Sequence, residues 1–268
     1  MPNRQKQAGN MTDYPLPYAS QDLTGQVALV TGATSGLGWR FSQVLANAGA
    51  KVVVGGRRKE RLDELVALIQ KNGGEAAAAT VDMTDSESII GFVEAGDKAF
   101  GTPTILVNNA GIPDAQRATK MPIDLIDRVF DTNLRGPFVL ATEVARRLMD
   151  AKKPGRMVNI SSAAAFLYSG EGAALYSVTK AGIVRMTEAL AVEWARFNIN
   201  VNAIAPGAFQ SEMMDGMLER VGDISKGMPR KRICDPALLD SSLLFLCSSA
   251  SEAVTGTVIR ADDGQNPR

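Results

Sequence analysis

Short apolar runs alternate with longer segments of helical periodicity along most of the chain, beginning at Gln26. Several of these runs are too apolar for half-exposed antiparallel strands, and such composition is typical of parallel strands buried on both faces. Each intervening segment is about long enough for one crossover helix. The pattern predicts seven strands, at residues 27–31, 51–55, 75–81, 104–108, 156–161, 199–205 and 256–260.

The segments between the predicted strands carry apolar residues at helical spacing. In ERLDELVALIQ, for example, Leu62, Leu65 and Leu68 fall on one face of a helix. Strands that alternate with helices form a parallel sheet with helices on both faces, so the predicted fold class is α/β with a doubly wound sheet. Helices are expected near residues 37–48, 58–71, 85–99, 123–151, 174–197 and 236–248.

The chain shows no low-complexity linker and no break in composition, so we interpret residues 23–268 as one domain. Residues 1–22 are polar and contain prolines, and they lack the apolar run of a signal peptide or a membrane span. We expect them to form a flexible N-terminal arm. Met11 in this arm is a second candidate for the translational start, and the sequence does not decide between it and Met1.

Residues 208–235 interrupt the alternation of strands and helices. They follow the end of a predicted strand and contain four methionines and three glycines. An insertion at such a position is suited to a substrate lid, and we interpret the segment as one. The alternative is a packed pair of helices whose methionines fill gaps in the core.

The charge balance of the chain excludes several classes of partner. It has 29 basic and 29 acidic residues and a pI near 6.4. No net field would attract nucleic acid or an anionic membrane, so a small molecule is the expected partner. With only Cys234 and Cys247 and no histidine, we expect neither a disulfide framework nor a metal site. A reducing, cytoplasmic location suits this composition.

A glycine-rich turn separates the first predicted strand from the first predicted helix. Glycines allow close backbone approach, and the N-terminus of a helix favours an anion, so the turn is suited to a pyrophosphate. The spacing is G-x-x-x-G-x-G, and an ordinary tight turn is the alternative. The predicted cofactor-binding residues here are Gly32, Ser35, Gly36, Leu37 and Gly38.

The end of the second predicted strand indicates which dinucleotide would bind. An acidic residue at this position binds the ribose 2′-hydroxyl of NAD, whereas an arginine accommodates the 2′-phosphate of NADP. The sequence has two glycines followed by Arg57 and Arg58. NADP(H) is therefore favoured over NAD(H) as the cofactor. The alternative is that both arginines flank a helix start on a solvated surface.

Three ordered motifs resemble those of the short-chain dehydrogenase/reductase family. They are T-G-x-x-x-G-x-G at Thr31–Gly38, NNAG at residues 108–111, and Y-x-x-x-K at Tyr176–Lys180, and the similarity runs from about residue 23 to 264. The resemblance implies a Rossmann-type sheet of seven parallel strands. It also implies hydride transfer between a nicotinamide and a ketone or secondary alcohol, and a homodimer or homotetramer formed through the helices at 123–151 and 174–197.

The resemblance also assigns cofactor contacts beyond the glycine-rich turn. It implies that Asn109, Ala110 and Gly111 contact the adenosine. Asp82 and Met83 would contact the adenine. Pro206, Gly207 and Ser211 would lie against the nicotinamide. For Asp82, capping of the following helix is the alternative.

Tyr176 and Lys180 would act on the substrate in place of the absent histidine. They lie one helical turn apart, so both side chains project from the same face. A phenol titrates near 10, and we expect the nearby ammonium, together with the oxidised nicotinamide, to lower that pKa. The resemblance implies that Tyr176 is the general acid/base and that Lys180 also binds the nicotinamide ribose.

The resemblance implies two further catalytic residues. A serine should donate to the substrate oxygen, and Ser162 is the match, although 13 residues separate it from Tyr176, about one more than expected, which leaves Ser161 as the alternative. Asn133 would bind a water that links Lys180 to solvent; the alternative is an amide satisfied by neighbouring backbone.

Two other functions remain to be weighed against a reductase. A catalytically silent dinucleotide-binding sensor would have no need of a tyrosine beside a lysine, and a methyltransferase would have no place for NNAG or Y-x-x-x-K. The basic run at 229–232 is interpreted as a solvated face, with a phosphorylated or coenzyme A-bound substrate as the alternative.

Overall fold

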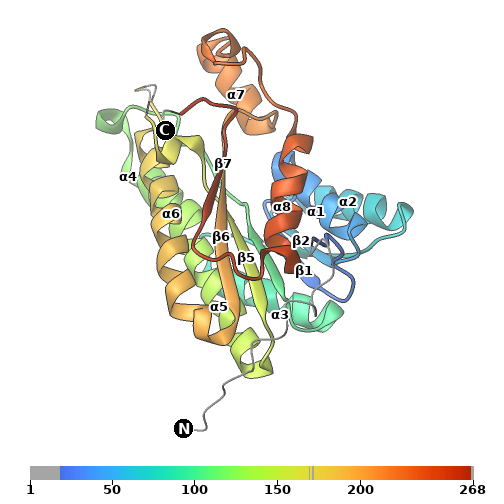
Figure 1. Ribbon diagram of the computed structural model, residues 1–268. Helices are drawn as coiled ribbons and strands as arrows, with labels where there is room; N and C mark the ends of the chain where they lie inside the picture. The colour runs from blue at the N-terminus through green and yellow to red at the C-terminus, as the bar shows by residue number, and fades with distance from the viewer. Residues whose placement is uncertain (1–18, 169, 171, 267–268) are drawn as a thin grey trace.

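The computed structural model describes residues 19–168, 170 and 172–266, and a seven-stranded parallel sheet forms its centre (Figure 1). The strands lie in the order β3-β2-β1-β4-β5-β6-β7. Most of the predicted N-terminal arm, Met11 included, lies outside the described residues. The strand bounds are β1 Val27–Thr31, β2 Lys51–Gly56, β3 Glu75–Thr80, β4 Ile105–Asn108, β5 Gly155–Ile160, β6 Ile199–Pro206 and β7 Val258–Ala261.

The burial of the strands agrees with the prediction of a sheet covered on both faces. Every residue of β1 and β4 is buried, and each pair of neighbouring strands is parallel. The edge strands β3 and β7 alternate or lie partly exposed, whereas β2, β5 and β6 each have a single partly exposed residue. The strand order reverses between β1 and β4, so their carboxyl ends form the switch point at which open α/β sheets bind ligands.

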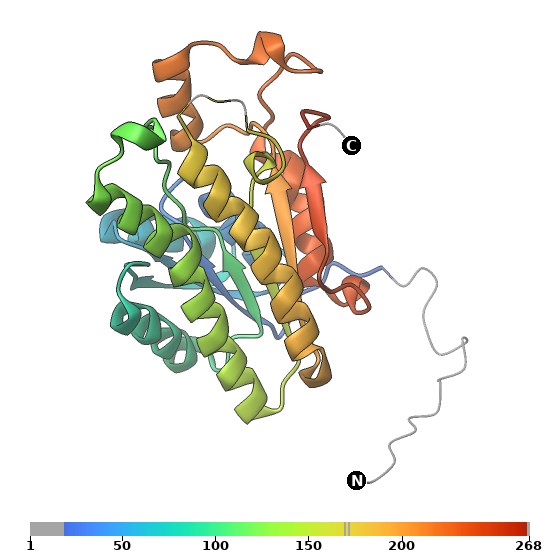
Figure 2. The ribbon, with the colours of Figure 1, turned by 90° about the vertical axis from the view of Figure 1, so that its left-hand side faces the viewer.

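Helices cover both faces of the sheet and produce two separate cores (Figures 1 and 2). One core contains apolar residues of α1, α2 and α8, and the other contains those of α3, α5 and α6. The fold is therefore the predicted doubly wound, Rossmann-type α/β domain. The helix bounds are α1 Gly36–Asn47, α2 Lys59–Lys71, α3 Ser86–Phe100, α4 Ile123–Phe130, α5 Gly136–Ala151, α6 Ala174–Trp194, α7 Glu212–Val221 and α8 Asp240–Cys247.

The helix expected over residues 123–151 is not a regular α-helix. A π-helical turn at Asp131–Arg135 separates α4 from α5. Pro137 lacks the N–H that would continue the α-helical hydrogen bonds, and its carbonyl oxygen accepts from the side chain of Asn108. A Cβ atom at Gly136 would overlap the carbonyl oxygen of Met83, so the helix approaches the end of β3 closely here.

The segment of residues 208–235 projects beyond the carboxyl edge of the sheet and contains α7 (Figure 2). Its base is closed by a parallel bridge between Phe209 and Cys234, in which Cys234 N–H donates to the carbonyl oxygen of Ala208. No residue of α7 is buried. The alternative of a helix pair whose methionines fill the core is therefore wrong for α7, because its methionines contact solvent.

Candidate active site

The glycine-rich turn packs tightly against the end of β4. A Cβ atom at Gly32 would lie 2.8 Å from the Cα atom of Ala110, and one at Gly38 would overlap the carbonyl oxygen of Gly32. Gly32 and Gly36 also have positive φ angles of 66° and 52°, which favour glycine. The backbone geometry therefore requires glycine at Gly32, Gly36 and Gly38, which an ordinary tight turn would not.

The residues of the NNAG motif fix this turn in position. The side chain of Asn109 donates to the carbonyl oxygens of Thr31 (2.9 Å) and Gly32 (3.2 Å). In return, the backbone N–H groups of Asn109 and Ala110 approach the hydroxyl of Thr31 at 3.2 Å. Asn109 thus organises the turn between β1 and α1, a role additional to the predicted contact with adenosine.

The N-terminus of α1 is suited to an anion. Its N-cap residue, Ser35, makes no side-chain capping bond, and the first turn of the helix carries no acidic residue. The first N–H groups of the helix and the positive end of its dipole are therefore not neutralised by its own cap. Together with the glycine-rich turn, this end of α1 fits the predicted pyrophosphate site.

The two predicted 2′-phosphate ligands lie at the end of β2, but their surroundings differ. Arg57 is exposed. The pKa of the nearby Asp82 carboxyl group is lowered mainly by the hydrogen bond from Thr84 N–H, and the charge of Arg57 lowers it further. Arg58 donates to the Thr34 hydroxyl at 2.8 Å and to the Glu212 carboxylate at 3.0 Å. Sequence reasoning gave no indication of the contact with Glu212.

Asp82 and Met83 follow β3 at the carboxyl edge of the sheet. The Asp82 carboxylate accepts from the N–H and the hydroxyl of Thr84, at 2.9 and 2.8 Å. The residue that caps α3 is Asp85, which accepts from Glu87 N–H. The helix-capping alternative for Asp82 is therefore wrong, and its adenine contact stays a prediction.

Helix α6 brings Tyr176 and Lys180 together. Lys180 is 4% exposed; its Nζ donates to the Ile160 carbonyl oxygen at 2.8 Å and lies 5.5 Å from the centre of the Tyr176 ring. A Cβ atom at Gly111 would lie 3.4 Å from this Nζ atom. Helix α6 and the NNAG motif therefore meet at the end of β5.

The pKa of Tyr176 departs from the expectation drawn from the sequence. Burial raises the pKa of this phenol; a hydrogen bond with Ser162 acts in the opposite direction, and the charge of Asp114 raises the pKa further. Burial also lowers the pKa of Lys180 to about 8. In the protein without nucleotide, desolvation of the phenolate therefore raises the pKa of Tyr176, and the lowering expected from the ammonium together with the oxidised nicotinamide stays a prediction.

The structure distinguishes the two candidate serines. The Ser161 hydroxyl is buried and donates to the Lys180 carbonyl oxygen at 2.8 Å, so it is occupied in holding α6 to β5. The Ser162 hydroxyl is hydrogen-bonded with Tyr176 and accepts from Ala164 N–H at 3.1 Å. This geometry supports Ser162 and not Ser161 as the residue beside the reacting oxygen.

Asn133 lies in the π-helical turn and is 1% exposed. Its amide oxygen accepts from Ile112 N–H at 2.8 Å, and its amide nitrogen donates to the Ile112 carbonyl oxygen at 2.9 Å. The side chain is therefore satisfied by neighbouring backbone, which was the alternative interpretation. A water relay through Asn133 stays a prediction and would have to use its backbone.

Asp114 is a residue of the site that sequence reasoning missed. It is 3% exposed, and its Oδ2 accepts from the N–H groups of Leu175 and Tyr176, at 2.9 and 3.1 Å. This carboxylate therefore caps the first turn of α6 and fixes the backbone of Tyr176. Its place three residues after the NNAG motif was visible, but a lone aspartate in a loop carries no periodic signal.

The C-terminal segment supports the predicted nicotinamide end. A Cβ atom at Gly207 would lie 2.5 Å from the side-chain oxygen of Gln265, and that oxygen accepts from Ala208 N–H at 3.0 Å. Pro206 ends β6 beside Ala261. Ser211 caps α7 by accepting from Met214 N–H, so its hydroxyl is engaged before any carboxamide is bound.

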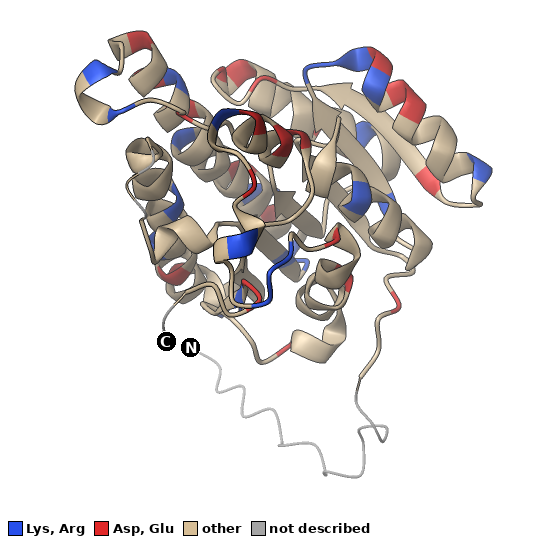
Figure 3. Cartoon of the chain, turned by 90° about the horizontal axis from the view of Figure 1, so that it is seen from above, with Lys and Arg blue, Asp and Glu red and all other residues tan. Residues whose placement is uncertain are grey.

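The basic run at 229–232 is accounted for by an acidic neighbour. Arg230 and Arg232 both form ion pairs with Asp263, at 3.1 and 2.8 Å. Viewed from above, acidic and basic residues are interspersed over this face (Figure 3). The run therefore ties the end of the 208–235 segment to the C-terminal segment, and the interpretation as a purely solvated face is incomplete.

Within the described ranges, no cluster of three or more histidine, cysteine or carboxylate side chains is arranged to hold a metal ion. The helices of this part of the chain include none with the length and apolarity needed to cross a bilayer.

Comparison with known sequences and structures gives a consistent assignment. Residues 26–221 match the family model described as short chain dehydrogenase. The chain is 35% identical over 243 residues to the 3-oxoacyl-[acyl-carrier-protein] reductase FabG of Thermotoga maritima, covering 90% of this chain and 98% of that protein. It is also 35% identical over 245 residues to the NAD-dependent glycerol dehydrogenase of Listeria innocua, covering 91% and 94%.

A solved structure extends the likeness to three dimensions. A variant of actinorhodin polyketide ketoreductase with NADPH superposes with a TM-score of 0.86 and 31% identity, over 93% of this chain and 100% of that one. The chain thus belongs to the short-chain dehydrogenase/reductase family, a family of oxidoreductases that bind nicotinamide dinucleotides.

Proposed function

We propose that the protein transfers hydride between NADP(H) and a ketone or secondary alcohol, with Tyr176 as general acid/base. The observation that carries this proposal is the arrangement of three side chains at the carboxyl edge of the sheet. Tyr176 is hydrogen-bonded with Ser162, and the Nζ of the buried Lys180 lies 5.5 Å from its ring centre. A protein that only binds a dinucleotide gains nothing from burying an ammonium beside a phenol.

The described residues fit a dinucleotide. Gly32, Gly36 and Gly38 keep side chains out of the turn that would approach the pyrophosphate, and the first turn of α1 itself contains no acidic residue. Arg57 and Arg58 stand where a 2′-phosphate would lie. Bound NADP(H) would supply the hydride and, when oxidised, a positive charge near the phenol.

The protonation states of the chain's own groups suit the reducing direction. Because burial raises the pKa of Tyr176, the phenol remains protonated at neutral pH and is ready to donate to a carbonyl oxygen. Ser162 would donate a second hydrogen bond to that oxygen as charge develops on it. Lys180 would hold the nicotinamide ribose and return a proton toward Tyr176, and Asn133 would position the water that connects this lysine to solvent.

A binding and turnover assay tests the proposal. NADPH fluorescence should increase on addition of the protein, and a panel of ketones should then consume NADPH with loss of absorbance. Tyr176→Phe should lower kcat by at least about 100-fold, the usual contribution of a general acid, with little change in NADPH affinity. A fluorescence increase without turnover of any carbonyl would favour the sensor, and an active Tyr176→Phe variant would show that another group is the acid.

The preference for NADPH is tested separately. Replacing Arg57 and Arg58 with alanine should weaken NADPH binding by about 10-fold or more and NADH binding much less, because each charge-assisted hydrogen bond to a phosphate contributes roughly 1.5–3 kcal/mol. Equal losses for the two nucleotides would mean that neither arginine contacts the 2′-phosphate.

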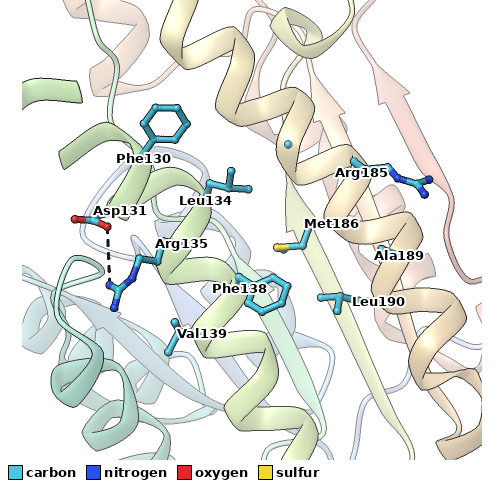
Figure 4. A pocket seen from close by; sticks show the side chains of 11 residues that line it. Phe130, Asp131, Leu134, Arg135, Phe138, Val139, Arg185, Met186, Ala189 and Leu190 are labelled. Atoms are coloured by element: carbon cyan, nitrogen blue, oxygen red, sulfur yellow. Dashed lines mark ion pairs between the residues drawn. The ribbon is translucent and has the colours of Figure 1, made fainter. Parts of the chain in front are cut away.

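We also propose that the chain forms a homodimer or homotetramer through α4, α5 and α6. An open apolar groove of about 610 Å³ runs between these helices, and none of its lining residues is a predicted catalytic or cofactor residue (Figure 4). Phe130 and Phe138 line it and are 37% and 48% exposed. A second copy would cover these rings. In sedimentation velocity, Phe138→Glu should shift the protein toward the monomer; an unshifted oligomer would place the interface elsewhere.

The cysteines and the 208–235 segment bear on location and substrate. Both cysteines are buried thiols, which is consistent with our expectation of a reducing, cytoplasmic compartment. The segment of residues 208–235 stands over the carboxyl edge of the sheet, where a lid would close on a small carbonyl or alcohol substrate.

A further inference from the structure

Glu212, the first residue of α7, links the predicted lid to the predicted 2′-phosphate site. Its two carboxylate oxygens accept from Nη1 and Nη2 of Arg58, at 3.3 and 3.0 Å. The hydroxyl of Ser35, in the glycine-rich turn, also hydrogen-bonds to this carboxylate, and the Arg58 bond lowers the pKa of Glu212. A carboxylate from a distant segment thus occupies donors that a phosphate group would use.

The start of α7 lies directly on the glycine-rich turn. A Cβ atom at Gly36 would be 3.1 Å from the Cβ atom of Ser211, the residue that caps α7. The start of α7 therefore packs against the turn. The interface consists of this close backbone approach in addition to the Arg58–Glu212 ion pair. Glu212 lies only three residues beyond Phe209, whose bridge to Cys234 closes the base of the segment.

Among the described residues, α7 is held against the domain mainly by contacts at the two ends of its segment. No residue of the helix is buried, so apolar packing into the core does not fix it. The far end of the segment is tied to Asp263 by Arg230 and Arg232, on the side of the C-terminal segment. The Glu212 carboxylate, through Arg58 and the Ser35 hydroxyl, therefore joins the first turn of α7 to the nucleotide side of the site.

A carboxylate and a 2′-phosphate would compete for the same guanidinium. Both groups are anionic acceptors that match the planar donor fork of arginine. In this structure, both Nη atoms of Arg58 donate hydrogen bonds to Glu212. Nη2 and Nε also donate to the hydroxyl of Thr34. A dinucleotide without the 2′-phosphate would make no demand on this fork.

We propose that Glu212 competes with the 2′-phosphate of the nucleotide for Arg58, so that NADP(H) binding breaks the Arg58–Glu212 pair and frees the first turn of α7. NAD(H) binding leaves the pair intact. Glu212 is then a determinant of nucleotide preference and couples the occupied 2′-phosphate site to the lid. This inference rests on the NADP(H) preference in the proposed function and not on hydride transfer.

The competition is measurable with ligands that cannot react. Adenosine 2′,5′-bisphosphate and adenosine 5′-monophosphate carry the adenosine end with and without the 2′-phosphate, and calorimetry gives both dissociation constants. Glu212→Gln should tighten the bisphosphate about fivefold, the scale of an exposed ion pair, and leave the monophosphate within about twofold. Asp215→Asn, which removes an exposed carboxylate from the same first turn, is the matched control and should change neither.

A double-variant cycle separates competition from general charge repulsion. In an Arg58→Ala background, Glu212→Gln should no longer tighten the bisphosphate, because the shared guanidinium is gone. If Glu212→Gln tightened the bisphosphate equally with and without Arg58, the proposed competition would be overturned. It would also be overturned if the single variant Glu212→Gln bound the bisphosphate no more tightly than the wild type does. If Arg58→Ala has no effect on bisphosphate affinity, Arg58 is not the phosphate ligand and the inference fails.

Hydrogen exchange tests the release of α7. The bisphosphate should raise amide exchange in residues 212–215 of the wild type, the monophosphate should not, and Glu212→Gln should show the raised exchange without ligand. Unchanged exchange with saturating bisphosphate would overturn the coupling to the lid. Because no readout uses turnover, an enzyme inactive on every carbonyl but with these shifts would refute the proposed function and leave this inference standing.

Discussion

Lys180→Met should stabilise the fold while it abolishes turnover. Lys180 is 4% exposed, and burial lowers its pKa to about 8 from an ordinary value of 10.5. A group with a lower pKa when folded is harder to keep charged in the native state than in the unfolded chain. At neutral pH the wild type therefore carries the cost of a buried ammonium, and methionine of similar length does not.

The magnitude follows from the two pKa values. At about 1.36 kcal/mol per pH unit, the difference between about 8 and 10.5 corresponds to about 3 kcal/mol of destabilisation at pH values below 8. Methionine cannot donate to the Ile160 carbonyl oxygen, which costs about 1 kcal/mol. The expected net gain for Lys180→Met at pH 7 is therefore about 2 kcal/mol.

The sign predicts the pH dependence. Between pH 8 and 10.5 the unfolded chain binds more protons at this lysine than the folded protein does, so wild-type stability rises with pH relative to the variant. Urea unfolding at pH 7 and pH 9.5 should show an advantage of the variant that shrinks at the higher pH. Lys71→Met, at an exposed lysine, is the control. An advantage that does not change with pH would refute a buried ammonium cost.

Three further predictions concern Asp114 and the glycine-rich turn. Asp114→Ala removes the cap of α6 and should cost about 1–3 kcal/mol in urea unfolding, with a fall in kcat. Asp114→Asn removes the negative charge that raises the pKa of Tyr176 and should move the pH–rate profile for alcohol oxidation to lower pH; an unmoved profile would contradict this electrostatic role. Gly38→Ala should abolish nucleotide binding in calorimetry, because the added Cβ overlaps the Gly32 carbonyl oxygen. The control, Gly91→Ala, lies in open space on α3 and should stabilise the folded protein by about 0.5–1 kcal/mol. Normal nucleotide binding by Gly38→Ala would show that the turn can adjust to the added Cβ.

The strands were predictable because their signal is local. All seven predicted strands are present, each within a few residues of its bounds, since short, largely apolar runs that alternate with helical segments favour strands at that length. The π-helical turn at Asp131–Arg135 was not predicted, because it depends on the approach of Gly136 to Met83, a tertiary contact.

The motif residues of the candidate site could be read from the sequence, but Asp114, the Arg58–Glu212 contact and the direction of the pKa changes could not. The spacing of Tyr176 and Lys180 is a property of the sequence, whereas the direction of their pKa changes depends on burial, which no local pattern reports. Similarly, Arg58 was identified from its place after β2, but its contact with Glu212 joins residues 154 positions apart. Such a pair leaves no mark on the periodicity of either segment.

The short loop after β4 has a consequence for how the protein can change. Asn109 holds the glycine-rich turn, Ile112 is clasped by Asn133, and Asp114 caps the helix that carries Tyr176. This stretch is a splint between the predicted nucleotide site and Tyr176, the proposed proton donor, and alterations to it would disturb both at once. Helix α7 beyond its first turn has no such double attachment. New substrate preferences, whether selected or engineered, should therefore accumulate in α7 and leave the splint unchanged.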